Sequence, residues 1–307
     1  MRAITYDHYG DDSVLKLTDQ PVPKVGPGEA LVRVRAAGVN PVDWKLMAGG
    51  LDALMDAYFP VIPGWDVAGV VEKLGIDTPE FAAGDEVYAY ARKDVVHGGT
   101  FAEFVTVPVR ALAHKPEALS FEQAAALPLA GLTAYQALTR LQAKQSDTVL
   151  IHNGAGGVGS AAVQIAAALG ARVIATASPE NHARLRSLGA AHALRYGEGL
   201  VEAVRAIAPG GVDLVLDLVG GVEDQTLAVL APTGRHASIA DPSVLEHGGQ
   251  WLWVRPDASE LDALSGLVDA GRLRVDVAAT YPLERVADAF AASRDGHVHG
   301  KLVITVV

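Results

Sequence analysis

A glycine-rich turn between two apolar segments constrains this chain more than any other feature. Residues 148–178 open with Val149-Leu150-Ile151, a continuous apolar run typical of a parallel strand that is covered on both faces. The next residues, 154–159, read GAGGVG and satisfy G-x-G-x-x-G. Small and apolar residues then recur at helical spacing as far as Gly170, and a second apolar run follows at 173–176. Strand, turn, helix and strand fit into about 30 residues, the span of one βαβ unit.

Three glycines of this turn are each required for a different physical reason. Gly154 permits a tight turn, Gly156 lets backbone N–H groups approach a pyrophosphate, and Gly159 lets the helix pack closely on the strand. Free N–H groups and the positive dipole at the helix start attract phosphate charge, and Gly157 lies at that start. Because the flanking elements are also as the motif requires, the sequence predicts a dinucleotide site rather than a bare structural turn.

Composition and charge narrow the class of protein. The 307 residues allow about two domains. Half of the residues are hydrophobic but only 6% are aromatic, which suits helices packed closely on a parallel sheet. A net charge of −11 without any run of Lys or Arg argues against nucleic acid as a partner. The absence of cysteine excludes disulfides and thiolate-ligated zinc.

The sequence carries no recognisable targeting or membrane signal. Its first residues become charged too early for a signal peptide. The longest apolar stretch is interrupted by Gly170 and Arg172, so no membrane span is expected. We therefore expect a cytoplasmic protein with no membrane partner.

The order of the expected elements predicts an α/β fold with two domains. Residues 1–113 are β-rich, with apolar and charged residues alternating at 31–36 and further strand-like runs at 67–74, 86–90 and 101–107. Residues 121–141 turn helical, with Ser120 and Gln123 as a capping box. Strands and helices then alternate, which predicts a doubly wound parallel sheet. The predicted division is a β-rich domain at 1–113, a nucleotide-binding domain at 114–272, and a return segment at 273–307 that completes the first domain.

Several stretches together resemble a known family. They are GVNPVDWK (38–45), FPVIPGWDVAG (59–69), GDEVY (84–88), GGTFAE (98–103), ALPLAGLTA (126–134) and the glycine turn. In this order they resemble the medium-chain dehydrogenase/reductase superfamily, specifically its zinc-free quinone oxidoreductase (zeta-crystallin-like) branch. The resemblance implies a GroES-like catalytic domain, a Rossmann domain, and a cleft between them.

The resemblance also bears on metal use. Zinc-dependent relatives carry a cysteine where Asn40 stands and a His-Glu pair where Trp65-Asp66 stands, so no catalytic zinc is expected. Without a Lewis acid, alcohol oxidation loses its usual mechanism. Hydride delivery to an acceptor that is already electrophilic remains feasible. We therefore expect a zinc-independent, NADPH-dependent reductase of quinones or α,β-unsaturated carbonyl compounds. The alternatives are a zinc-free enoyl reductase of acyl-type substrates and a low-turnover NADPH-binding sensor or structural protein.

The end of the second expected strand indicates which cofactor is used. An NAD site usually has an acidic residue there, and this chain has none. Ser178, Asn181 and Arg184 are candidates to contact a 2′-phosphate instead, and the resemblance assigns Tyr196 to the same phosphate. Ser178 is also a candidate helix N-cap before Pro179, and Arg184 is alternatively a solvated helix residue. NADPH is expected over NADH.

The resemblance assigns further residues to the reacting end. Thr133 is expected beside the nicotinamide, Val158 under its ring, and Asn40 near its ribose and the substrate. Asp43 and Lys45 share the loop of Asn40, either as catalytic groups or as a solvated ion pair, with the ion pair slightly favoured. The residues expected to complete the cofactor groove are Ser238, Ile239 and Lys301. No general acid is assigned, because a reduced quinone can take its proton from solvent.

The oligomeric state is predicted from the resemblance, which implies a homodimer. The run 250–254 contains Trp251 and Trp253, and an edge strand of this kind is hidden when two copies pair. The alternative is that both rings pack in the core of the monomer.

Overall fold

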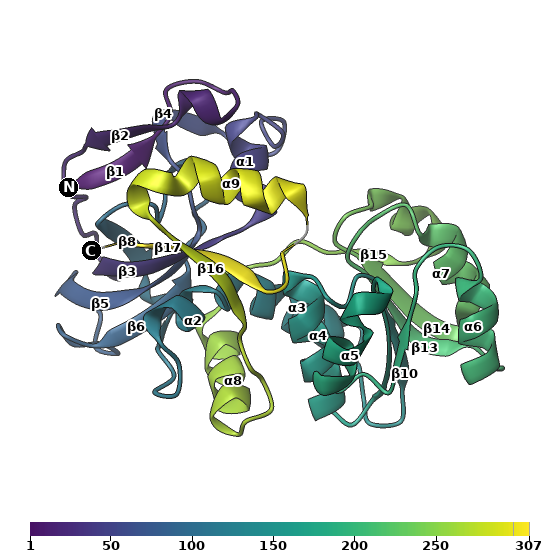
Figure 1. Cartoon of the computed structure of the whole chain (residues 1–307). Helices are drawn as coiled ribbons and strands as arrows, with labels where there is room; N and C mark the ends of the chain where they lie inside the picture. Colours follow the sequence, from purple (N-terminus) through teal and green to yellow (C-terminus); the bar gives the residue numbers. More distant parts are fainter. Residues whose placement is uncertain (297, 307) are drawn as a thin grey trace. The chain divides into compact units, whose positions relative to one another are not determined.

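The computed structural model describes residues 1–296 and 298–306 (Figure 1). The chain forms two compact units, each made of segments that are distant in sequence. The first unit comprises Met1–Leu132, Pro256–Asp269 and Val275–Val307, and the second comprises Thr133–Arg255 and Ala270–Arg274. The domain boundaries expected from the sequence, after 113 and 272, stay a prediction.

The first unit is built on a seven-stranded sheet. Its path runs β16-β17-β3-β5-β6-β9, and β8 also pairs with β3. The strands are β3 (Glu29–Val39), β5 (Asp66–Leu74), β6 (Glu86–Tyr90), β8 (Phe104–Pro108), β9 (Leu112–His114), β16 (Val277–Pro282) and β17 (Lys301–Thr305). All pairs are antiparallel except β16 with β17. The alternation at 31–36 has the expected effect, because Val32 and Val34 are buried while Arg33 and Arg35 are exposed.

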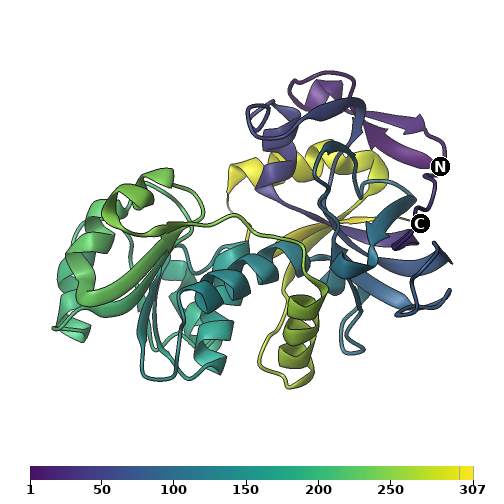
Figure 2. The ribbon, with the colours of Figure 1, turned by 180° about the vertical axis from the view of Figure 1, so that it is seen from behind.

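Two small sheets and several helices complete this unit. The small sheets pair β1 (Arg2–Thr5) with β2 (Lys16–Asp19) and β4 (Ala57–Ile62) with β7 (Val96–Gly98). The helices are η1 (Asp12–Val14), α1 (Pro41–Met47), η2 (Val109–Ala111), α2 (Phe121–Ala125), α8 (Ala258–Asp269), η5 (Leu283–Arg285) and α9 (Val286–Asp295). The predicted capping box starts α2, since Ser120 Oγ accepts from Gln123 N at 3.3 Å and Gln123 Oε1 accepts from Ser120 N at 3.1 Å. The chain returns to this unit through β17, so the first and last strands of the chain, β1 and β17, both belong to it (Figure 2).

The second unit contains a six-stranded parallel sheet in the order β12-β11-β10-β13-β14-β15. Its strands are β10 (Thr148–Ile151), β11 (Arg172–Thr176), β12 (His192–Leu194), β13 (Val212–Asp217), β14 (Leu230–Ser238) and β15 (Gln250–Trp251). Its helices are α3 (Pro128–Arg140), which begins in the first unit, α4 (Gly157–Ala168), η3 (Pro179–Asn181), α5 (His182–Ser187), α6 (Leu200–Ile207), α7 (Glu223–Val229) and η4 (Pro242–His247). The predicted doubly wound parallel sheet is confirmed.

The core of this sheet explains its continuous apolar strands. Leu150, Ile174 and Val215 from three neighbouring strands are fully buried, and Val204 of α6 packs against them. Because a central parallel strand is covered on both faces, no position along it tolerates a solvated side chain.

The edge strand β15 is shorter than expected and covers only Gln250–Trp251. Trp251 is 43% exposed and Trp253 is 38% exposed. The alternative that both indole rings pack in the monomer core is therefore wrong. β15 is the last strand in the order of this sheet, so within the described residues it pairs with β14 on one side and forms an edge of the sheet on the other.

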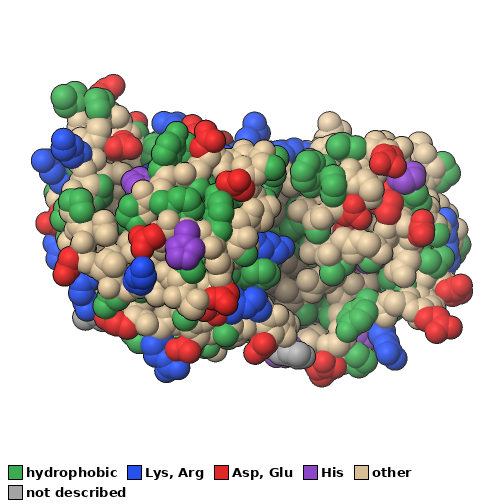
Figure 3. Space-filling view, turned by 90° about the horizontal axis from the view of Figure 1, so that it is seen from above, with side chains coloured by type: hydrophobic (Ala, Val, Ile, Leu, Met, Phe, Trp, Pro, Cys, Tyr) green, Lys and Arg blue, Asp and Glu red, His purple; other side chains and the backbone are tan. Residues whose placement is uncertain are grey.

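The described residues include no helix whose length and apolar character would let it cross a membrane. On the face drawn in Figure 3, acidic and basic side chains are interspersed over both units. This distribution agrees with a net charge of −11 that comes without basic clusters.

Candidate functional site

The glycine turn lies at the carboxyl end of β10, where β11 helps to hold it. Gly154 N donates to Thr176 O at 2.8 Å, and Asn153 N donates to Thr176 Oγ1 at 3.0 Å. Asn153 has φ +57°, a left-handed conformation that few non-glycine residues adopt. This reversal of direction brings the chain to Gly156, the N-cap of α4.

Close packing explains why glycine is needed at two positions of the turn. A Cβ at Gly159 would lie 2.1 Å from the backbone oxygen of Asn153, and one at Gly154 would lie 2.8 Å from the Cβ of Ala175. Gly159 therefore allows the first turn of α4 to touch the loop that precedes it. A larger residue at position 159 would have to displace the backbone of Asn153, which cannot move aside as the end of a flexible side chain can.

The start of α4 has the properties of a phosphate site. Gly157, Val158 and Gly159 are the first three helical residues, and N–H groups at these positions have no acceptor within their own helix. Three N–H groups and the positive end of a 12-residue helix suit a nucleotide diphosphate. The glycine turn and this helix start therefore fit a dinucleotide cofactor.

Of the residues predicted to contact a 2′-phosphate, Arg184 contacts this turn, and Ser178 and Asn181 hydrogen-bond to each other. Asn181 Nδ2 donates to Ser178 Oγ at 3.0 Å, and Arg184 Nη1 donates to the backbone oxygen of Ala155 at 2.9 Å. Ser178 does occupy an N-cap position before η3, although its hydroxyl does not cap that helix. Arg184 is half-buried against the glycine turn, and its contact with a 2′-phosphate stays a prediction. Tyr196 follows β12 and is 59% exposed.

Ser238 is the last residue of β14 and Ile239 follows it, at the same edge of the parallel sheet. Ser238 is fully buried, and its hydroxyl donates to Asp217 Oδ2 at 2.7 Å while accepting from the N–H of Asp241 at 2.9 Å. Ile239 N donates to the backbone oxygen of Asp217 at 3.1 Å. Ser238 thus joins the ends of β13 and β14. Thr133, in α3, is 7% exposed.

A second polar cluster lies in the first unit, around Asn40. Asn40 N donates to Asp43 Oδ2 at 2.8 Å, and Asn40 Nδ2 donates to Asp66 Oδ2 at 2.9 Å. Lys301 Nζ donates to Asn40 Oδ1 and, at 2.9 Å, to the backbone oxygen of Val39. We call Asn40, Asp43, Asp66 and Lys301 the Asn40 cluster.

Neighbouring strands bring the Asn40 cluster together. β17 pairs with β3 so that Leu302 lies opposite Val39, and Asp66 begins β5 on the other side of β3. The cluster therefore lies at one end of three adjacent strands. The ammonium of Lys301, expected to complete the cofactor groove, lies in this cluster, and its contact with a cofactor stays a prediction.

Burial dominates the electrostatics of the Asn40 cluster. It raises the pKa of Asp43 to about 8, although the hydrogen bond from Asn40 N acts in the opposite direction. It raises the pKa of Asp66 to about 6, against the opposing effects of Lys301, Asn40 and the N–H of Leu129. Burial also lowers the pKa of Lys301, while the two carboxyl groups act to raise it.

Lys45 is not part of this cluster. It is exposed, and its Nζ lies 5.6 Å from the ring centroid of Trp44. Asp43 is 1% exposed. The solvated Asp43–Lys45 ion pair is therefore wrong. Positions two apart on a helix differ by about 200°, so α1 turns one inward and the other outward.

The side chains at positions 40, 65 and 66, where zinc-dependent relatives carry metal ligands, do not fit a zinc ion. Both oxygens of Asp66 already accept N–H hydrogen bonds, from Asn40 and Leu129. Trp65 offers an indole in place of a metal ligand, and the ammonium of Lys301 supplies the positive charge. Among residues 1–296 and 298–306, no group of three or more His, Cys, Asp or Glu side chains could hold a metal.

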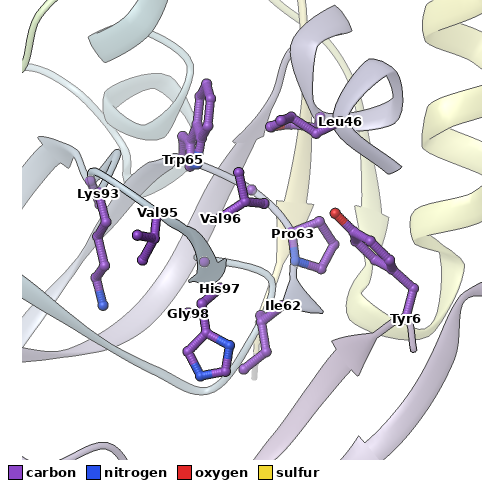
Figure 4. Close-up of a pocket in the computed structure, with 14 residues that line it drawn as sticks. Tyr6, Leu46, Ile62, Pro63, Trp65, Lys93, Val95, Val96, His97 and Gly98 are labelled. Carbon is purple, nitrogen blue, oxygen red and sulfur yellow. The ribbon is translucent and has the colours of Figure 1, made fainter. Parts of the chain in front are cut away.

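A pocket of the first unit is lined in part by Asp43. Tyr6 follows β1, and its hydroxyl group points into the pocket, while Leu46, Ile62 and Trp65 supply apolar walls (Figure 4). The enclosed part measures about 10 Å³, the room that one water-sized group takes up.

Sequence reasoning missed two residues of this region. The sequence argument uses Asp66 only as a replaced zinc-ligand position, although a carboxylate at the start of an otherwise apolar strand indicates a buried polar partner. Nothing in the sequence indicates a functional role for Tyr6, because a tyrosine after a short strand is common.

Comparison with known proteins agrees with this architecture. Residues 26–117 match the alcohol dehydrogenase GroES-like domain family, and residues 188–304 match the family described as zinc-binding dehydrogenase. The NADPH-dependent alkenal/one oxidoreductase, chloroplastic, of Arabidopsis thaliana is 36% identical over 313 residues, which cover 99% of this chain and 79% of that protein. The chain belongs to the medium-chain dehydrogenase/reductase superfamily.

Solved structures of this superfamily extend the likeness to its quinone oxidoreductase branch. The quinone oxidoreductase from Coxiella burnetii has 38% sequence identity and a TM-score of 0.89, covering 100% of this chain and 99% of that one. A mycobacterial protein complexed with NADPH has 32% identity and a TM-score of 0.86, covering 99% of this chain and 100% of that one. The predicted GroES-like and Rossmann architecture of a medium-chain dehydrogenase/reductase is confirmed, and the protein is an oxidoreductase.

Proposed function

We propose that this medium-chain dehydrogenase/reductase uses NADPH to reduce a quinone or an α,β-unsaturated carbonyl compound. One observation carries the proposal: Arg184, from the segment in which Asn181 donates to Ser178, contacts a glycine turn that fits a pyrophosphate. The end of β11 offers no acidic side chain for a ribose 2′-hydroxyl. The Arabidopsis relative is named as NADPH-dependent and acting on alkenals and alkenones, and the Coxiella relative as acting on quinones.

The residues of the glycine turn would hold the pyrophosphate through backbone N–H groups, and Arg184 would supply positive charge near a 2′-phosphate. Bound NADPH supplies the hydride. Thr133 and Val158 are proposed to position the nicotinamide, and Tyr196 to contact the adenosine phosphate. Ser238 and Ile239 are proposed to line the groove from the ends of the neighbouring strands.

Zinc independence is part of the proposal. The Asn40 cluster contains the ammonium group of Lys301, and both oxygens of Asp66 already accept N–H hydrogen bonds. An acceptor conjugated to a carbonyl group needs no Lewis acid to accept a hydride. This chemistry suits quinones and enones better than simple alcohols.

Steady-state oxidation of NADPH with 1,4-benzoquinone, 9,10-phenanthrenequinone and an acyclic enone tests the function, with NADH measured in parallel. We expect turnover with at least one class and a preference for NADPH. Turnover only with acyl thioester enoyl substrates would favour the enoyl reductase alternative. NADPH binding without oxidation of NADPH by any acceptor would contradict the reductase and favour a sensor or structural protein.

We also propose a homodimer that pairs through β15. Its support is the exposed edge formed by Gln250 and Trp251. The cytoplasmic location expected from the sequence stays a prediction.

A further inference from the structure

The charges of the Asn40 cluster do not balance unless one carboxyl group holds a proton. Asp43 and Asp66 are 1% and 0% exposed, and among the described residues the ammonium that interacts with both is that of Lys301. Two carboxylates with one ammonium would leave a net negative charge in a buried site, which is costly. One proton on one carboxyl group makes the cluster neutral.

Hydrogen bonding decides which carboxyl group carries that proton. Asp66 accepts N–H bonds at both oxygens, from Asn40 Nδ2 at 2.9 Å and from Leu129 N at 2.8 Å, which stabilise its charged form. Asp43 accepts one, at Oδ2 from Asn40 N. Its Oδ1 is buried and has no hydrogen-bond partner among the described residues. The proton therefore belongs on Asp43 Oδ1.

The pocket beside Asp43 suits the oxygen of a substrate. Asp43 and Tyr6 both line it, and the Tyr6 hydroxyl is likewise buried without a partner among the described residues. The enclosed space takes one water-sized group, which is the size of a carbonyl oxygen. A carboxylic acid and a phenol at such a site offer two O–H donors to a single acceptor.

Other charged or titratable groups surround this point. Asp66, Tyr90 and Lys301 interact electrostatically with Asp43, and Lys93 and His97 also line the pocket. Burial raises the pKa of Tyr6 and of Tyr90, so both phenols stay neutral over the working pH range. Burial lowers the pKa of Lys93.

We propose that Asp43 is the general acid of this reductase and that, together with Tyr6, it binds the carbonyl oxygen of the substrate. This inference rests on the proposed function. Bound NADPH would supply the hydride, whose C–H bond at the dihydronicotinamide would break as a C–H bond forms at the β-carbon of an enone. The π pair of the C=C bond would then form the Cα=C bond of the enol, and the π pair of the C=O bond would move to the carbonyl oxygen. The O–H bond of Asp43 breaks as the enol O–H bond forms. The Asp43 carboxylate regains a proton from solvent, and the enol tautomerises to the saturated ketone.

The same site explains a difference between two substrate classes. An enolate is a strong base that needs a proton as it forms, whereas a hydroquinone anion is weakly basic and takes its proton from water. Loss of the acid at Asp43 should therefore slow enone reduction more than quinone reduction. The arrangement of a neutral carboxylic acid beside a tyrosine has the electrostatic properties of an oxyanion hole.

The experiment compares wild type with Asp43→Asn, which keeps the shape of the side chain but has no acidic proton. We expect kcat/KM for 2-cyclohexen-1-one to fall at least 100-fold, and for 1,4-benzoquinone less than 10-fold, with NADPH affinity within 2-fold. The wild-type enone profile should also decline above pH 8, and Asp43→Asn should lose that decline. Thr226→Val, which removes a buried hydroxyl of the second unit that has no hydrogen-bond partner among the described residues, is the control and should retain wild-type rates.

Two further measurements keep the outcome clear if Asp43→Asn does not fold. Tyr6→Phe should lower kcat/KM for the enone about 10-fold, and infrared pH titration of the wild type should show a protonated carboxylic acid at pH 7. An enone rate within 3-fold of wild type in Asp43→Asn, or a fully ionised set of carboxyl groups at pH 7, would overturn the inference. A wild type that oxidises NADPH with neither class of acceptor contradicts the proposed function instead.

Discussion

The ammonium group of Lys301 donates a hydrogen bond to the side-chain oxygen of Asn40, although 261 positions separate the two residues in sequence. Through this contact the last strand of the chain supplies the cation of a cluster that also contains Asp43 and Asp66. Zinc-dependent relatives place a cysteine ligand where Asn40 stands. In this chain, the polar groups around Asn40 are paired by hydrogen bonds with one another and with the ammonium group of Lys301.

Removing this cation should destabilise the protein. Lys301→Met leaves the Asp66 carboxylate and the Asn40 carbonyl buried without their positive partner, and we expect a loss of about 3–5 kcal/mol in the free energy of unfolding. Urea denaturation monitored by circular dichroism measures it. Lys24→Met, at an exposed lysine of the same unit, should change stability by less than about 0.5 kcal/mol. Equal effects of the two substitutions would contradict the role given to Lys301.

The raised pKa of Asp43 predicts how stability depends on pH. Between the unfolded value near 4 and the folded value of about 8, the folded state holds a proton that the unfolded state releases. Stability from this group is therefore greatest below pH 4 and is lost as pH rises toward 8, with a slope of up to about 1.4 kcal/mol per pH unit. Urea midpoints of wild type and Asp43→Asn over pH 5–8 test this. The stability of wild type relative to the variant should fall with pH, and parallel curves would show that Asp43 is ionised when folded.

The close approach at Gly159 should make the nucleotide site sensitive to a single methyl group. The added Cβ of Gly159→Ala meets the backbone oxygen of Asn153 at 2.1 Å, so the start of α4 must shift. We expect the dissociation constant for NADPH to rise at least 10-fold in a fluorescence titration. Gly210→Ala, where an added Cβ has nothing within 4 Å, should bind NADPH as wild type does. An unchanged dissociation constant for NADPH in Gly159→Ala would mean that the phosphates of NADPH bind elsewhere.

Arg184 should distinguish the two nicotinamide cofactors. Its guanidinium lies against Ala155 of the glycine turn, near Ser178 and Asn181. Arg184→Ala should raise KM for NADPH about 10-fold and leave KM for NADH within 2-fold, because only NADPH carries the 2′-phosphate. Arg186→Ala, at an exposed position of the same helix, is the control. Equal increases in KM for NADPH and NADH would mean that Arg184 stabilises the glycine turn but does not contact the 2′-phosphate.

The exposed edge at β15 predicts a dimer. Light scattering should give about twice the chain mass of 32.0 kDa, and Trp251→Glu should shift the protein toward monomer. Ile76→Glu changes another strongly exposed hydrophobic residue and should leave the dimer intact. A wild-type monomer at micromolar concentration would remove this proposal.

Local sequence signals were sufficient for the nucleotide-binding half of the fold. The apolar run at 149–151, the glycine turn and Gly170 lie within one βαβ unit, so their spacing alone predicted β10, α4 and β11. The capping box at Ser120 and Gln123 was equally local, and it starts α2 as expected. Such features are predictable because hydrogen bonds and packing between near neighbours determine them.

The Asn40 cluster was decided by tertiary structure alone. Asn40, Asp43, Asp66 and Lys301 come from three separate parts of the sequence, and the order of strands β17, β3 and β5 brings them together. The sequence predicted that Asp43 and Lys45 lie in one loop, which is wrong because both lie on α1, and the direction in which α1 turns each of them depended on its packing. Burial, which sets the protonation of Asp43, exists only once distant strands exclude water from the carboxyl group.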